Sequence, residues 1–173
     1  IKIQNYPSLE LIIADGLSSD RTVEIIRRYE SLVSCLICEK DGGVAEALNK
    51  AFRRATGEVF CYINADDSFT PGALLCVAET FRSHPEIDVV TGGCQRVYED
   101  GEISLSKAPN DFQRLLPIIY KIEQSATFWR ASAHRAAGEL DESYSLAFDW
   151  EWFNRLNNNK ARFFAVEQIL SIY

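Results

Sequence analysis

The chain has 173 residues, about the length of one domain, and its 47% hydrophobic and 25% charged residues are typical of a globular protein. A net charge of −7 without a lysine or arginine cluster argues against binding nucleic acid through its phosphates. The apolar runs are much shorter than the roughly 20 residues that cross a bilayer, and the N-terminus lacks the pattern of a signal peptide.

Two hydrophobic periods alternate in the first part of the chain. Residues 9–15 (LELIIAD) form an apolar run typical of a strand, and residues 22–32 carry apolar side chains at helical spacing. The alternation continues with strands at 33–39, 58–64 and 88–98 and with helices at 44–57 and 71–84. This order indicates βαβ units with right-handed crossovers. We therefore predict an α/β fold with a mostly parallel sheet flanked by helices.

The second part of the chain is less regular. We expect a hairpin turn at residues 99–102, and the hydrophobic pattern of residues 102–121 is weak. Further elements are expected as a strand at 125–130, helices at 131–138 and 148–159, and terminal strands within 161–173. Because no repeat, linker or low-complexity tract interrupts the chain, we expect a single domain over residues 1–173.

Two of the five cysteines, Cys35 and Cys38, have the C-x-x-C spacing of some metal sites. The stretch around them reads as a strand, where residues three apart point to opposite faces. No second pair follows at zinc-finger spacing. We therefore interpret the cysteines as small hydrophobic residues in a reducing compartment, and we expect the two histidines, His84 and His134, at the surface.

The first three predicted strands all end in polar clusters. Asp15 and Asp41 stand after the first and second strand, and each could also be an ordinary turn aspartate. Asp66 and Asp67 follow the third strand, where one of them could cap the helix that Pro71 opens. Ligands of open α/β sheets bind outside the carboxyl ends of the strands. Adjacent carboxylates there favour a hard cation such as Mg²⁺ or Mn²⁺.

Several stretches, in one order over nearly the whole chain, resemble the family 2 glycosyltransferases, which are inverting enzymes of GT-A (Rossmann-like) fold. They are QNYPSLELIIADGLSSDRT (4–22), EKDGGVAEALNKAFRRATGE (39–58), YINADDSFTPGAL (62–74), QSATFWR (124–130), GELDESY (138–144) and FDWEWFNRL (148–156). The resemblance implies a nucleotide-sugar-binding half over residues 1–100 and an acceptor-binding, catalytic half over residues 101–173.

On the donor side, the resemblance assigns Asp15 to the nucleotide and Asp41 to the wall of the same pocket. Asp66 matches the aspartate that holds the metal against the donor diphosphate. Asp67 is its neighbour on the sugar side, and Asn64 replaces the first aspartate of the family's D-x-D segment, where it can still bond the ribose or a metal-bound water.

On the acceptor side, Asp149 matches the catalytic base, which takes the proton of the acceptor hydroxyl. Its alternative role is to cap the helix expected at 148–159. Phe148 stands where the family usually has an acidic residue. Gln124 and Asp141 are further candidates for the acceptor side.

The implied reaction transfers a sugar from a UDP-, GDP- or dTDP-sugar to a glycan or lipid-linked acceptor, with Mg²⁺ or Mn²⁺, in bacterial polysaccharide or cell-surface glycan synthesis. We expect a cytoplasmic protein, or one held at the inner face of the plasma membrane, and leave a homodimer open. The family's first strand, expected before residue 4, is missing from this sequence. A nucleotidyltransferase and a catalytically inactive nucleotide-binding or partner domain remain as alternatives, although the Gly-rich basic loop of the former is not found.

Overall fold

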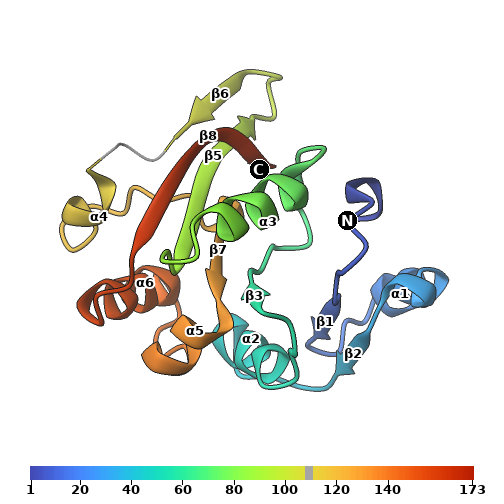
Figure 1. Ribbon diagram of the computed structural model, residues 1–173. Coiled ribbons are helices and arrows are strands. Elements are labelled where there is room, and N and C mark those ends of the chain that lie inside the picture. The colour runs from blue at the N-terminus through green and yellow to red at the C-terminus, as the bar shows by residue number, and fades with distance from the viewer. Residues whose placement is uncertain (108–110) are drawn as a thin grey trace.

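The structure is a computed structural model and describes residues 1–107 and 111–173 (Figure 1). Its first part contains the elements β1 (Ile12–Asp15), α1 (Thr22–Arg28), β2 (Cys35–Cys38), α2 (Val44–Phe52), β3 (Val59–Phe60), β4 (Ser68–Phe69), α3 (Ala73–Ser83) and β5 (Val89–Val97). Its second part contains β6 (Ile103–Ser106), α4 (Phe112–Leu115), β7 (Thr127–Arg130), α5 (Ala131–Ala137), α6 (Phe148–Asn158) and β8 (Phe163–Ile172). Short 3-10 helices η1 (Lys2–Gln4), η2 (Glu30–Leu32) and η3 (Gln124–Ala126) connect them.

The sheet is mixed and has two parts. β1 and β2 form a parallel pair, which Figure 1 shows beside α1. The larger part has the strand order β3-β7-β5-β8-β4, with β6 paired to β5. In the larger part, β5 and β8 run parallel, whereas the pairs β3–β7, β5–β7, β4–β8 and β5–β6 are antiparallel. The predicted α/β class is confirmed, but the expected mostly parallel pairing is wrong because β7 enters antiparallel between β3 and β5.

The two parts of the sheet are joined by side chains. In the described parts of the chain, β1 pairs with β2 alone and β3 pairs with β7 alone. The Glu10 carboxylate accepts the backbone N–H groups of Thr56 and Gly57, at 2.7 and 3.1 Å, and so ties the start of β1 to the approach to β3. The Gln4 amide likewise donates to the carbonyl of Thr70 at 2.8 Å. These bonds hold the β1–β2 pair in place without strand pairing.

The core consists of two clusters on the two faces of the larger sheet. One gathers around Trp129, Trp152 and Phe153, all of which are almost fully buried. The other gathers around Phe81 and Phe128. Both clusters receive side chains from the two halves of the sequence, so both halves contribute to the larger sheet and to its packing. None of the described helices is long and apolar enough to span a bilayer.

His134 lies in this core, so the expectation of a surface histidine is wrong. Its ring packs against Phe52, Phe60 and Trp152, and its Nδ1 accepts the indole N–H of Trp129 at 3.4 Å. Burial lowers the pKa of His134 to about 4, because charging the ring among aromatic side chains is unfavourable. The histidine therefore stays neutral at pH 7.

Candidate active site

Asp15 ends β1 as a buried carboxylate. Its Oδ2 accepts the backbone N–H groups of Leu17 and Ser18 at 3.1 and 3.0 Å, and the Cys38 thiol lies 3.5 Å from the same oxygen. Hydrogen bonds from Ser18 are the main cause of a lowered pKa of Asp15, so the group is ionised near neutral pH. Asp15 thus organises the turn after β1 and brings a negative charge to the carboxyl end of the strand.

Asp41 approaches the same turn from the loop after β2. Its Oδ1 accepts the N–H of Gly43 at 3.1 Å. Its Oδ2 lies so close to Gly16 that a Cβ on that glycine would be 2.7 Å away, nearer than real contacts allow. Gly16 therefore permits the close approach, and the sequence-predicted pair Asp15 and Asp41 does meet at one edge of the sheet.

The turn that follows β3 and precedes β4 holds Asn64, Asp66 and Asp67. The Oδ2 of Asp67 accepts the side-chain and backbone N–H groups of Asn64, at 3.2 and 3.4 Å. Its Oδ1 is buried and has no partner among the described residues. Burial, followed by the charge of Asp66, raises the pKa of Asp67, and the hydrogen bonds from Asn64 offset this only in part. Asp66 itself is exposed.

This turn fits a divalent cation. A buried carboxylate oxygen without a hydrogen-bond donor beside a second carboxylate is the kind of donor set that Mg²⁺ and Mn²⁺ take. Nowhere in residues 1–107 and 111–173 do three or more His, Cys, Asp or Glu side chains gather as a metal cage. A cation at Asp66 and Asp67 would therefore complete its coordination with phosphate and water oxygens, as Mg²⁺ commonly does.

Asp149 is the second residue of α6. The helix is capped by Ala147, which has a positive φ of 58°, and has no side-chain cap, so the alternative role of Asp149 as the helix cap is wrong. Its Oδ1 accepts the N–H of Trp150 at 2.8 Å, and its Oδ2 accepts the hydroxyl of Tyr120 at 2.5 Å. The carboxylate is thus held on both oxygens at the N-terminal end of α6.

Tyr62 lies between β3 and the Asn64 turn. Burial is the main cause of its strongly raised pKa, and the negative charges of Asp149 and Asp67 add to it. Gln124 donates its amide N–H to the Tyr62 carbonyl at 2.6 Å. Gln124 therefore supports the segment that leads into the turn with Asp67.

Asp141 serves a local turn. Its Oδ1 accepts the N–H of Ser143 at 2.9 Å, and the bonds from Ser143 lower its pKa. Its neighbours Leu140 and Glu142 bind the buried amide of Asn49, which anchors the loop to α2. An acceptor-side role for Asp141 stays a prediction.

The site residues thus form three groups. Asp15 and Asp41 lie after β1 and β2, Asn64 and Asp67 bond one another in the turn after β3, and Asp149 is bonded to Tyr120 at the start of α6. Within the described residues, no hydrogen bond or ion pair links one group to another. Tyr120, the partner of Asp149, was missed at the sequence level because it lies in a weakly patterned segment.

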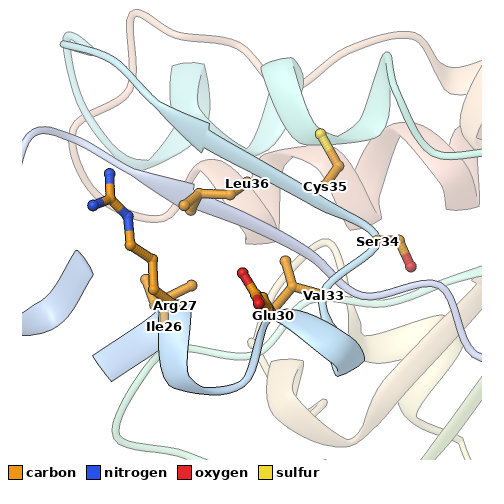
Figure 2. A pocket seen from close by; sticks show the side chains of 7 residues that line it. All are labelled: Ile26, Arg27, Glu30, Val33, Ser34, Cys35 and Leu36. Atoms are coloured by element: carbon orange, nitrogen blue, oxygen red, sulfur yellow. The ribbon is translucent and has the colours of Figure 1, made fainter. Parts of the chain in front are cut away.

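A pocket of about 230 Å³ lies elsewhere, between α1, η2 and the amino-terminal half of β2, at the end of the strand opposite to the candidate site (Figure 2). It is lined by Ile26, Arg27, Glu30, Val33, Ser34, Cys35 and Leu36. Its position separates it from the carboxylates described above.

The sequence model of glycosyl transferase family 2 matches residues 1–138. The chain belongs to this family. A family 2 relative from Mycobacterium bovis, a PGL/p-HBAD biosynthesis glycosyltransferase, is 29% identical over 162 residues, which are 91% of this chain and 62% of that protein. The chain spans between 18% and 62% of the length of the curated relatives that it matches.

Solved structures show that this family 2 chain has the GT-A fold. TarS of S. aureus, in complex with UDP, superposes with a TM-score of 0.80 at 18% identity, over 99% of this chain and 53% of TarS. The mannosyltransferase PcManGT of Pyrobaculum calidifontis, in complex with GDP-Man and Mn2+, superposes with a TM-score of 0.73 at 22% identity, over 99% of this chain and 50% of that one. The predicted GT-A fold is thereby confirmed, whereas the family match ends before Asp149.

Proposed function

We propose that this family 2 glycosyltransferase chain binds a nucleoside-diphosphate sugar with a divalent cation and transfers the sugar, with inversion, to an acceptor hydroxyl. The observation that carries the proposal is the buried, unpartnered Oδ1 of Asp67 beside a second carboxylate, Asp66. The carboxylate of Asp149, anchored on both oxygens, offers a base.

The cation would be Mg²⁺ or Mn²⁺, held by Asp66 and Asp67 with support from Asn64. When bound, it would supply positive charge against the leaving diphosphate. The Mn2+ and GDP-Man in the PcManGT complex support this assignment by analogy of fold. The protein's own contribution is to bury Asp67 Oδ1 without a hydrogen-bond donor, which leaves its charge to be balanced by a cation.

Asp149 is the proposed base. Transfer with inversion needs one carboxylate that takes the proton of the acceptor hydroxyl as that oxygen attacks the sugar. Both Asp149 oxygens accept a hydrogen bond, yet each carboxylate oxygen has further lone-pair capacity for the acceptor. No covalent intermediate on the protein is required by this scheme.

Asp15 and Asp41 would contact the nucleotide. Both carboxylates lie at the carboxyl ends of a parallel pair, the usual position of nucleotide sites in α/β sheets. Carboxylates are acceptors for base N–H and ribose hydroxyl groups. The UDP complex of TarS supports a nucleoside diphosphate as the ligand class.

The setting we propose is bacterial cell-surface glycan or polysaccharide synthesis, with a glycan or lipid-linked acceptor. The biosynthetic name of the mycobacterial relative supports this setting. Among nucleotides we propose UDP, GDP or dTDP as the carrier.

Calorimetric titration of UDP, GDP and dTDP, each with and without Mn²⁺, tests the donor site. We expect one nucleotide to bind only with the metal, and Asp66→Ala to weaken that binding at least about tenfold through the lost metal ligand. Asp100→Asn, on the turn between β5 and β6, is the matched control that removes one charge elsewhere. No binding of any nucleotide would contradict the donor site and favour an inactive domain.

A further inference from the structure

The segment between α4 and η3 is packed against the start of α6. The indole N–H of Trp150 donates to the Leu116 carbonyl at 2.7 Å. The ring of Tyr120 stacks on Trp150 and Phe153, with centroids 6.0 and 6.5 Å apart and planes inclined by 27° and 30°. Because Trp150 and Phe153 are three residues apart on α6, they present one continuous aromatic surface to the tyrosine.

This packing leaves the Tyr120 hydroxyl with one partner in the described structure, Asp149. The hydroxyl donates to Oδ2, while the N–H of Trp150 donates to Oδ1. Burial and the charge of Asp149 raise the pKa of Tyr120 far above its usual range. The tyrosine is therefore protonated at every working pH and remains a hydrogen-bond donor.

We propose that Tyr120 is the positioning residue of the base Asp149, an inference that rests on the proposed function. Rotation of the carboxylate about its Cβ–Cγ bond would break the bond to the tyrosine hydroxyl, so the plane of the carboxylate is fixed by two donors on opposite oxygens. A proton acceptor that is fixed in one orientation needs no reorientation when the hydroxyl attacks.

The alternative is that Tyr120 only packs. A phenylalanine would then serve equally well, since the stacking on Trp150 and Phe153 uses the ring alone. Tyr120→Phe keeps that ring and deletes the single bond to Asp149. The variant therefore separates the positioning role from the packing role without opening a cavity.

The experiment has two parts, both on the whole chain. First, thermal unfolding of the parent, Tyr120→Phe, Asp149→Asn and the double variant forms a double-mutant cycle, and we expect non-additive shifts in Tm. Second, release of nucleoside diphosphate from UDP-GlcNAc and GDP-mannose gives kcat and KM. We expect Tyr120→Phe to lower kcat about tenfold with KM unchanged.

Tyr98→Phe is the control, because it deletes another tyrosine hydroxyl bond, to Ser104 on the β5–β6 hairpin, and should leave kcat unchanged. Additive Tm shifts, or a Tyr120→Phe variant with the parent's kcat, would overturn the positioning role. A fully active Asp149→Asn variant would instead overturn the proposed base. A parent chain that releases no nucleotide from either donor would rule out these two sugars as donors, and the double-mutant cycle in Tm would then decide the role of the Tyr120 bond.

Discussion

Replacing Asp67 by asparagine should make the protein more stable and at the same time remove its metal-dependent nucleotide binding. The Oδ1 of Asp67 is buried without a partner among the described residues, and the nearby charge of Asp66 adds repulsion. A buried polar group without a hydrogen bond costs roughly 1–3 kcal/mol. Asparagine removes the charge and keeps an oxygen that can accept the N–H groups of Asn64, but its amide nitrogen takes the place of the unpartnered oxygen and inherits that cost. The gain therefore comes from the charge alone, and we expect about 1 kcal/mol.

For a chain of this size, 1 kcal/mol corresponds to a rise in Tm of roughly 2–4 °C. Thermal unfolding at pH 7 with a chelator present measures this gain, and titration with nucleotide and Mn²⁺ measures the loss of binding. Because the pKa of Asp67 is raised in the fold, its destabilising charge is present above that pKa and absent below the ordinary value of 3.8. The advantage of asparagine should therefore disappear as the pH falls toward 3.8.

Asp100→Asn is the matched control, since it removes one carboxylate from an exposed turn and should change neither quantity. A Tm difference between Asp67→Asn and the parent that is the same at pH 7 and at pH 3.8 would refute the reasoning, because the expected gain comes from a charge that the parent loses at low pH. If Asp67→Asn has a higher Tm but still binds nucleotide with Mn²⁺, Asp66 would be the carboxylate that holds the cation.

Three further outcomes are expected. His134→Gln should make the stability less dependent on acid pH. The pKa of His134 is about 4 in the fold and 6.5 in the unfolded chain, so the parent's free energy of unfolding should fall by about 3 kcal/mol between pH 6.5 and 4. Urea unfolding across that range measures this loss. Asp15→Ala should destabilise the chain by about 1–3 kcal/mol, because the N–H groups of Leu17 and Ser18 lose their acceptor, and it should weaken nucleotide binding. An unchanged midpoint of urea unfolding would contradict this. Glu10→Ala should cost about 1 kcal/mol because the tie to Thr56 and Gly57 is lost, and faster amide hydrogen exchange in β1 would report it.

The positions of Asp15 and Asp41 were predictable because they depend on local sequence. Asp15 ends β1 and Asp41 follows β2, as the apolar runs before them indicate, and parallel neighbours bring such ends together. The sequence shows a glycine at position 16 but not why a glycine is needed there. That need arises because Asp41, from another loop, approaches Gly16 too closely for a Cβ.

The pairing of the sheet was predicted poorly because it depends on distant segments. Val59 pairs with Arg130, and Val90 pairs with Phe128, so a strand from the second half separates β3 from β5. A hydrophobic run predicts a strand but does not indicate whether the neighbouring strand is parallel or antiparallel. The alternation of strands and helices in the first half therefore suggested more parallel pairing than the structure contains.

His134 illustrates the same limit for a single residue. A lone histidine in a short helix gives no sign of burial, and its environment is created by aromatic side chains from α2, β3, β7 and α6. Its low pKa follows from that enclosure and not from any neighbour in sequence. Tertiary packing decides whether such a residue can titrate at physiological pH.

The surroundings of Asp149 were predictable where they depend on local sequence and unpredictable where they depend on a distant segment. Asp149 could be recognised from the stretch FDWEWFNRL, but its hydrogen-bond partner Tyr120 lies 29 positions earlier, in a segment without a readable pattern. The start of α6 explains why: its aromatic residues pack the segment that holds Tyr120, and the same turn of helix carries the carboxylate. A substitution of Tyr120 can thus change the orientation of the Asp149 carboxylate while Asp15, Asp41 and Asp67 keep their contacts. Donor binding and transfer rate should therefore respond to different parts of this chain.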